Sequence, residues 1–486
     1  MFSLWHDQPP SPHTARQRKL LSRREWLCVG GLSGMGLSDF ALRSLQNQTA
    51  AMADDRSTDK TTMPAKAKRC VFIFLFGGPS HIDLWDMKPH APENVRGIFQ
   101  PIATSAPGIQ LSELLPNLAK EADKLCLLRS MTHGDPVHGT ACSQVITGRA
   151  HRRPGTTDTL APDDWPSLSA LVMRYGRSAL GMPSSVVLPW YLMFPSQGMR
   201  IAGQSGGLMG EEHNAFLVSG DPSEKDFDVP GIKLPHDVPT ARLLSREGLL
   251  RDVDQVRRAV VDGPSSHLVN DNYRQAFAMI GGQRSAAAFD LADETPTTRE
   301  RYGSHKFGQS LLLARRLVER GVSLVTVNWD DESRDEKQSP FWDTHHDNFG
   351  RLKKLTPIFD KAFAAFLADL HARGLLDSTL VVALGEFGRT PKIGQFTQNA
   401  ATEKTGRDHW PHAFTALIAG GGVPGGHIFG ASDRLGGHVA DKPVTPPDLA
   451  ATMLTHLGVN PSLRYHAPLL SESFPLSTGR PIRDWG

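Results

Sequence analysis

An alternation of short apolar runs with amphipathic helical patterns constrains the fold of this chain most. The first run, Cys70 to Phe76, is continuously apolar and stops at the glycines Gly77 and Gly78. Such a run is typical of a strand that is buried on both faces, as in a parallel sheet. Further runs of the same character are found at 125–128, 185–188, 324–327, 380–384 and 414–418.

Helical patterns alternate with these runs, and we predict helices over 307–320, 356–374 and 445–458. In the second of them Thr356 is predicted as the N-terminal cap and Pro357 as the first helical residue. The Gly-rich stretch 190–240 is predicted to be a loop insertion. Strand–helix alternation across residues 69–486 predicts a single α/β domain with a doubly wound, mostly parallel sheet.

The first 53 residues have the features of an export signal. The pair Arg23 and Arg24 precedes a weakly apolar, Gly-rich run at 27–37, which is shorter than the roughly 20 residues that cross a bilayer. Ala51-Met52-Ala53 matches a small-residue cleavage pattern. We therefore predict a twin-arginine signal over 1–53, a periplasmic or secreted location, and the twin-arginine export machinery as a partner.

The composition of the remaining chain excludes several classes of protein. Residues 54–68 are polar and are predicted to be a tether, and no later segment is apolar enough to be a transmembrane helix. The whole chain has a net charge of +2 and a hydrophobic content of 39%, and without residues 1–53 the net charge is −1; these values argue against nucleic-acid binding and against general disorder. Cys70, Cys126 and Cys142 are too few for a disulfide framework and are predicted to be buried free thiols.

Polar segments rich in His, Asp and Glu lie next to the predicted strands. In an open parallel sheet the ligand crevice lies beyond the carboxyl ends of the strands, so these segments are expected to approach one another. Each of them alone could equally be a solvated turn or a structural ion pair. The segments are 77–86, 133–140, 342–347, 385–390 and 407–412.

A divalent metal is predicted because carboxylate and imidazole groups recur in these segments, most densely in the third. The candidate ligands are Asp83, Asp343, His345, His346, Glu386, Asp408 and His409. The pattern leaves open whether the ion is zinc, manganese, calcium or magnesium.

Other residues of the same segments are candidates for catalysis and substrate binding. His81 and His138 are predicted acid–base groups, with a metal ligand or a nucleophile as alternative roles for His138. The Arg389 guanidinium is predicted to hold an oxyanion. Ser80 is a candidate hydroxyl at the end of the first strand. The predicted substrate-binding residues are Gly77, Gly78 and His412.

Four motifs together resemble the domain of unknown function 1501 family, which consists of exported bacterial proteins. They are Gly77-Gly-Pro-Ser-His-x-Asp83, Trp342-Asp-x-His345, Glu386-Phe-Gly-Arg-Thr-Pro391 and Gly406-Arg-Asp-His-Trp-Pro411. That family is related to the alkaline phosphatase and sulfatase superfamily. The resemblance implies a doubly wound α/β fold and metal-assisted hydrolysis of phosphate or sulfate esters, with an anionic ester as substrate, such as a sulfated or phosphorylated glycan.

The chain departs from the superfamily pattern at three positions. Phe387 stands where a His ligand is expected, and His138 stands at the nucleophile position, nine residues before Thr147-Gly148. Gly77 and Gly78 follow the first strand, where an Asp is expected. These departures keep a second hypothesis open, that of a non-catalytic family member that binds a glycan or a cell-surface component.

Overall fold

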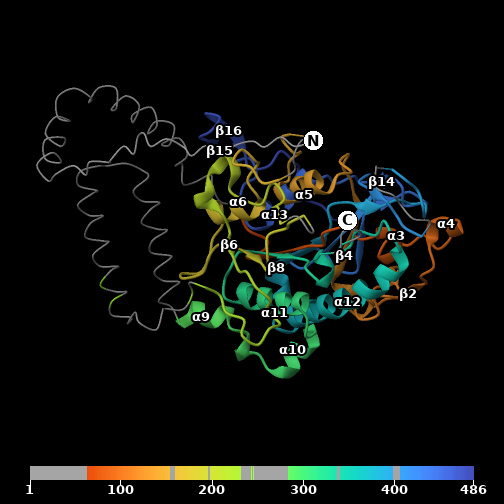
Figure 1. Ribbon diagram of the computed structural model, residues 1–486, viewed down its shortest axis with the longest axis horizontal. Helices are drawn as coiled ribbons and strands as arrows, with labels where there is room; N and C mark the ends of the chain where they lie inside the picture. The colour runs from red at the N-terminus through yellow and green to blue at the C-terminus, as the bar shows by residue number, and fades with distance from the viewer. Residues whose placement is uncertain are drawn as a thin grey trace, which may run out of the picture. The chain divides into compact units, whose positions relative to one another are not determined.

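The computed structural model describes residues 63–153, 159–194, 198–230, 283–335, 340–397 and 405–485, with positions 232, 242 and 245 (Figure 1). The predicted signal at 1–53 and residues 54–62 of the predicted tether lie outside the described residues. The last residues of that tether lie against the body, where the Ala67 amide donates to the His456 carbonyl at 2.9 Å.

The described residues form a central sheet with the strand order β12-β4-β11-β8-β1-β7-β5-β6. Every pairing is parallel except the two made by β11, which runs antiparallel to β4 and to β8. The predicted α/β fold with a mostly parallel sheet is therefore confirmed, and each of the six apolar runs contributes a strand. The strands are β1 Arg69–Phe74, β4 Leu125–Met131, β5 Ser185–Leu188, β6 Phe216–Leu217, β7 Leu324–Asn328, β8 Thr379–Leu384, β11 Phe414–Ala419 and β12 His427–Phe429.

Strand direction decides where the polar segments meet. The carboxyl ends of β1, β4, β7 and β8 lie at one edge of the sheet, and the reversed strand β11 begins at that same edge. The segments after those four strands and the segment before β11 are consequently brought together.

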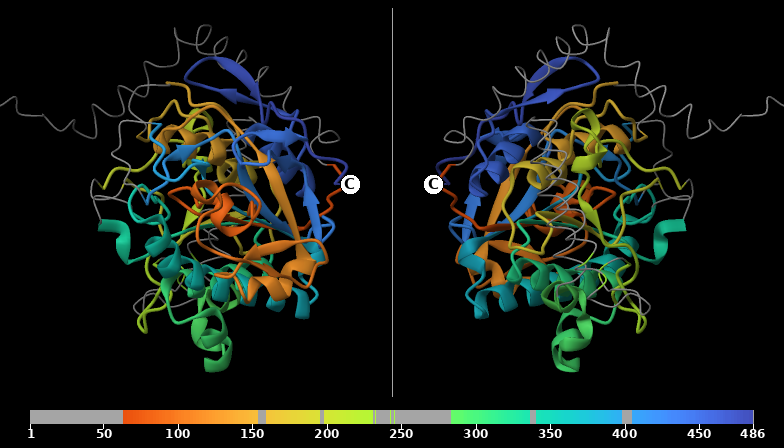
Figure 2. Two further views of the ribbon diagram at one scale, coloured as in Figure 1. Left: turned by 90° about the vertical axis from the view of Figure 1, so that its right-hand side faces the viewer. Right: turned by 90° about the vertical axis from the view of Figure 1, so that its left-hand side faces the viewer.

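Helices cover both faces of the sheet (Figures 1 and 2). On one face α6 packs against β5 and β7, and α13 packs against α5 and α6; on the other, α11 packs against β1 and β7 and also against α9, α10 and α12. The helices are α3 His81–Leu84, α4 Glu93–Arg96, α5 His138–Thr147, α6 Leu168–Tyr175, α9 Gln283–Phe289, α10 Pro296–Tyr302, α11 Lys306–Glu319, α12 Asn348–Ala372 and α13 Pro446–His456.

Helix α12 begins earlier than the sequence predicts. The side chain of Asp347 accepts the Gly350 amide at 3.1 Å and caps the helix. Pro357 therefore lies inside the helix rather than at its first position, and the predicted start at Thr356 is wrong. Buried Leu352 extends the apolar face toward the N-terminus, so tertiary packing overrides the proline signal.

Short antiparallel pairs stand beside the sheet, and the pair β9–β10 places His409 opposite Arg389. Within the predicted insertion, β6 forms an edge strand of the central sheet. Cys70, Cys126 and Cys142 are buried thiols that form no disulfide among the described residues, as predicted. No helix among the described residues is long and apolar enough to span a bilayer. The short strands are β2 Pro101–Ala103, β3 Gln110–Ser112, β9 Gly388–Arg389, β10 His409–Trp410, β13 Ala431–Ser432, β14 Val439–Asp441, β15 Arg464–Ala467 and β16 Glu472–Pro475.

Candidate metal centre

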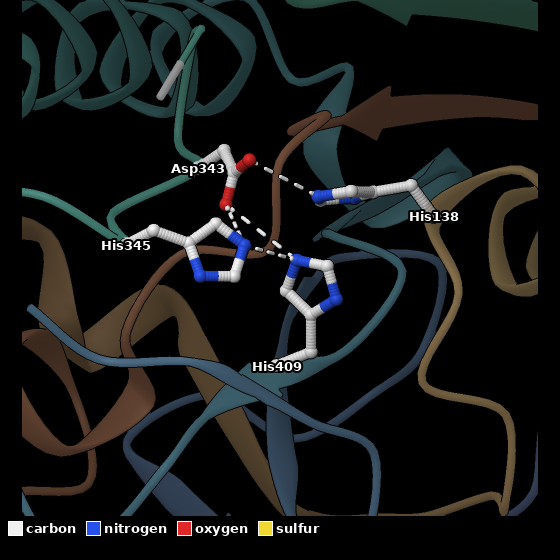
Figure 3. Close-up of side chains that lie close together, drawn as sticks. All are labelled: His138, Asp343, His345 and His409. Atoms are coloured by element: carbon white, nitrogen blue, oxygen red, sulfur yellow. Dashed lines mark hydrogen bonds and ion pairs between the residues drawn. The ribbon is translucent and has the colours of Figure 1, made fainter. Parts of the chain in front are cut away.

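Four side chains from distant parts of the chain converge at the carboxyl edge of the sheet (Figure 3). His138 is the first residue of α5, Asp343 and His345 lie between β7 and α12, and His409 begins β10. One potential ligand atom of each residue lies within 4.8 Å of those of the other three. We call these four residues the His–Asp cluster.

Each imidazole of the cluster has one nitrogen turned toward an acceptor outside it. The Nδ1 atom of His138 lies 2.5 Å from Oε1 of Glu386. The Nδ1 atom of His409 lies 2.7 Å from the Pro136 carbonyl, and a carbonyl can only accept, so this nitrogen carries the proton. The Nδ1 atom of His345 faces a carboxylate oxygen of Asp408 at 3.3 Å.

The Nε2 atoms of the same rings point inward, toward Asp343 (Figure 3). The distance from Asp343 Oδ1 to His345 Nε2 is 3.1 Å, and that from Oδ2 to His138 Nε2 is 3.3 Å. The Nε2 atoms of His345 and His409 are 2.8 Å apart. At that separation the two nitrogens share either a proton or a bound cation, and a cation fits where the Nδ1 atoms carry the ring protons.

The donor set therefore fits a divalent metal ion. Three imidazole nitrogens and one carboxylate are ligand types of zinc-like ions, with bonds of about 2.0–2.1 Å. Two nitrogens on a tetrahedral ion of that kind are about 3.3 Å apart. The rings of His345 and His409 would need to separate by only about half an ångström from their 2.8 Å spacing.

The surroundings lower the pKa of the two imidazoles that lie closest to each other, His345 and His409, which favours their neutral form. Burial is the main cause that lowers the pKa of His345 to about 4, and burial together with the positive charge of His138 lowers that of His409 to about 3. Both rings are thus neutral at physiological pH, as metal ligands must be.

The other two members of the cluster carry opposite charges. Burial alone would lower the pKa of His138, but the carboxylates of Asp343 and Glu386 raise it to about 9. Burial alone would raise the pKa of Asp343, yet Arg389 and His138 hold it well below its usual range. Beside two carboxylates the His138 imidazolium supplies the positive charge that a bound cation would supply in its place, and His138 must release a proton before it can act as a ligand.

Two of the predicted ligands lie behind the cluster and support it. Both carboxylate oxygens of Glu386 accept the Gly77 amide, at 3.0 and 3.2 Å, while one also contacts His138. Asp408 faces His345 and accepts the His409 amide at 2.8 Å. The structure thus places Glu386 and Asp408, both predicted as ligands, where they orient imidazoles.

Arg389 is buried and bonded to protein at all three guanidinium nitrogens. Its Nε donates to the Gly78 carbonyl at 2.9 Å, its Nη1 to the Arg407 carbonyl at 3.2 Å, and its Nη2 to the Gly77 carbonyl. Nη2 also lies 2.7 Å from Asp343 Oδ1. The predicted oxyanion holder is therefore placed as a partner of Asp343.

Asp83, predicted as a ligand, lies in a separate buried network. Its carboxylate pairs with both Nε and Nη2 of Arg407, at 2.8 and 3.1 Å. It also accepts the Ser80 hydroxyl at 2.6 Å and the Asn348 amide at 2.9 Å. This network joins the loop after β1 to the segment that carries His409, and it occupies both Asp83 and Ser80.

The remaining predicted residues are placed outside the cluster. His81 is buried, and its Nε2 lies 2.9 Å from the Gly436 carbonyl. His412 is exposed beside the His438 ring, and His346 is half-buried. Gly78 has φ +71°, and a side chain there would meet the Phe387 ring.

Sequence reasoning missed the partners that hold these groups. The Phe387 ring, at a position where a ligand is expected, packs against His138 and His409, with centroids 5.0 and 4.5 Å apart. Arg407 is missed because it pairs with Asp83, which lies 324 positions away in the sequence. No local pattern reports a contact at that separation.

No curated protein matches the chain. The chain is similar to the solved structure of the PsFucS1 sulfatase from Pseudoalteromonas sp., with 12% identity, a TM-score of 0.35, and coverage of 91% of this chain and 74% of that one. A likeness to the phosphonate monoester hydrolase SpPMH from Silicibacter pomeroyi has 13% identity, a TM-score of 0.37, and coverage of 85% and 75%.

A protein in the alkaline phosphatase superfamily from Vibrio parahaemolyticus is similar at 12% identity and a TM-score of 0.32, with coverage of 82% of this chain and 69% of that one. The family model described as "Protein of unknown function (DUF1501)" matches residues 67–484. The chain therefore belongs to the DUF1501 family.

Proposed function

We propose that this chain is an exported, metal-dependent hydrolase of phosphate or sulfate esters, with its metal held by the His–Asp cluster. The observation that carries the proposal is the orientation of the three imidazoles, each with Nδ1 facing an outer acceptor and Nε2 facing Asp343. The resemblance of the four motifs supports the ester class, and Arg23-Arg24 before an apolar run supports export.

The donor set favours one group of metals over another. Calcium and magnesium prefer sites built from oxygen ligands, whereas imidazole suits zinc and other transition metals. With three imidazoles and one carboxylate, the cluster is proposed to bind zinc or a similar transition ion.

Hydrolysis of an anionic ester requires positive charge where the negative charge of the substrate repels a nucleophile. A bound metal supplies that charge and lowers the pKa of water. The residues of the chain keep the ligands in place. Glu386 holds the His138 ring through Nδ1, Arg389 holds Asp343, and the Phe387 ring covers His138 and His409.

The proposal is tested by metal analysis and turnover on the purified chain. Native protein prepared with excess metal is expected to retain a stoichiometric transition ion and to hydrolyse an aryl phosphate or an aryl sulfate. His409→Ala is expected to lose both the ion and the activity. His371→Ala changes an exposed histidine of α12 and is expected to keep both. A native protein that retains no metal would contradict the proposal.

A second candidate function is metal-dependent binding without catalysis. It is favoured by the position of His138, which stands where the superfamily nucleophile is expected and whose ring contacts Glu386 and Asp343. A protein that binds metal through the cluster but turns over no ester in a broad panel would support this candidate.

A further inference from the structure

A pocket of about 240 Å³ lies at the same edge of the sheet as the His–Asp cluster. Its lining comes from residues that follow three neighbouring strands, β1, β5 and β7. Phe76 follows β1, the run from Trp190 to Phe194 follows β5, and Asn328 to Asp330 end or follow β7. Ligand sites of open α/β sheets occur at this edge.

Phe76 connects the pocket with the cluster. It lines the pocket, and its ring centroid lies 5.4 Å from that of His138. On its other side it contacts Phe341, at 5.7 Å, which also lines the pocket and stands two residues before Asp343. The pocket and the His–Asp cluster therefore share the wall that these two rings form.

The exposed part of the lining is aromatic. Trp190, Tyr191 and Phe194 are half-buried, so part of each ring remains accessible. The Arg200 guanidinium lies 3.7 Å from the Tyr191 ring centroid and covers one face of that ring. Rings of this kind offer flat apolar surfaces to a ligand.

Two polar side chains accompany the aromatic rings. The Asn328 side-chain amide donates to the Trp190 carbonyl at 2.7 Å, which fixes its orientation. Asp330 is buried, and its Oδ2 accepts from Lys306 at 2.7 Å, so its charge is largely balanced. A few fixed polar groups among apolar rings are typical of a site that selects an uncharged polar ligand.

The size and lining of the pocket fit a single sugar ring. A water molecule takes up about 30 Å³, so about 240 Å³ holds one small ring and its hydroxyls but not a chain of rings. The C–H face of a sugar ring packs on aromatic surfaces, and its hydroxyls pair with carboxylate and amide groups. No lysine or arginine stands among the described residues that line the pocket, so the pocket offers no cation to an anionic group.

We infer that this pocket binds one uncharged sugar ring. On the proposed function, this ring is the part of the ester that carries the anionic group, and Phe76 places that group beside the His–Asp cluster. Sugar binding itself does not depend on the metal.

The test uses neutral free monosaccharides as probes: D-glucose, D-galactose, L-fucose and N-acetyl-D-glucosamine. Binding to the full chain is measured by ligand-observed saturation-transfer NMR. Saturable binding of at least one sugar is expected. Trp190→Ala is expected to weaken it at least about tenfold, since one aromatic surface is lost. Trp165→Ala is the matched control, since Trp165 packs against Phe474 and does not line the pocket.

Two further variants keep the test decisive if Trp190→Ala is unstable. Trp190→Phe retains a ring and is expected to retain part of the affinity. Asp330→Asn keeps the shape of the side chain and is expected to weaken binding while its melting temperature shows it folded. The inference is overturned if no sugar binds, if both tryptophan-to-alanine variants bind equally well, or if phenol binds and no sugar displaces it.

His409→Ala separates this inference from the proposed function. It removes a cluster residue that does not line the pocket, so it is expected to lose metal while sugar binding persists. Sugar binding by a native protein that retains no metal would uphold the pocket and refute the metal-dependent hydrolase. Ester hydrolysis by a native protein that binds no sugar would uphold the hydrolase and refute the sugar pocket.

Discussion

At the scale of single residues, Glu386 holds two parts of the site together. It is fully buried, accepts the Gly77 amide with both oxygens, and lies 2.5 Å from His138 Nδ1. A carboxylate in that position fixes the tautomer of a ligand imidazole and increases its basicity. Its charge is therefore expected to affect the affinity of the proposed metal site, although Glu386 is not one of the four clustered residues.

Glu386→Gln is expected to lower metal affinity by about 10–100-fold, because the amide retains the shape but not the charge. The measurement is a competition titration against a chelator of known affinity. Glu93→Gln changes an exposed glutamate and serves as the control. Unchanged affinity in Glu386→Gln would show that Glu386 does not act on the metal through His138.

Gly77 tests the packing of the loop that carries Asp343. Its φ is +109°, and an added Cβ would lie 2.5 Å from the Asp343 nitrogen. Gly77→Ala is expected to displace this loop and reduce metal content, which metal analysis and thermal melting would detect. Gly108→Ala is the control: it has φ +84° with no atom within 4 Å. Gly108→Ala is expected to lower the free energy of unfolding by about 1–3 kcal/mol through backbone strain alone, and to keep the metal site. Equal metal content in the two variants would contradict the expectation.

The sequence predicts much of the site at residue level, but not the role of each residue. Asp343, His345 and His409 are predicted ligands that the structure brings together. His138 is predicted first as an acid–base group, and the structure brings it to the other three residues. No local pattern in the sequence reveals that it lies close to Asp343. Asp83 looks like a ligand in sequence because its pairing with Arg407 is visible only after folding.

At the scale of elements, apolar runs predict strands well and helix starts less well. The strand β5 matches the predicted run 185–188, and β7 extends its run by one residue. The reversed direction of β11 leaves no trace in the run itself, since a fully buried strand reads alike in either direction. In α12, Pro357 suggests that the helix begins near Thr356. The Asp347 cap and the packing of the first turns make it begin at Asn348 instead.

Pro357 is exposed within α12 and provides a prediction for this element. Pro357→Ala supplies a missing backbone amide donor and is expected to raise the free energy of unfolding by about 1–3 kcal/mol. This range already includes the loss that comes from the higher conformational entropy of the unfolded chain without the proline. Denaturant unfolding measures the gain. Pro446→Ala is the control, because Pro446 occupies the first turn of α13, where proline is favourable. No gain in Pro357→Ala would mean that packing of α12 requires the proline.

At the scale of the whole molecule, sheet topology assembles the site from remote segments. The His–Asp cluster takes His138 from the segment after β4, Asp343 and His345 from that after β7, and His409 from that before β11. The sequence predicts that such segments approach one edge. It does not predict the strand order that makes β1 the neighbour of both β7 and β8. That order depends on packing across the sheet.

A metal bound to these segments would link them in the folded chain only. An ion present at about a thousandfold excess over its Kd stabilises the folded state by about 4 kcal/mol. A chelator is therefore expected to lower the melting temperature of the native protein, on the order of 5 °C, and added metal should restore it. His409→Ala should melt at one temperature with or without chelator, whereas His412→Ala should respond as the native protein does. If neither chelator nor added metal changes the melting temperature of the native protein, no ion links these segments.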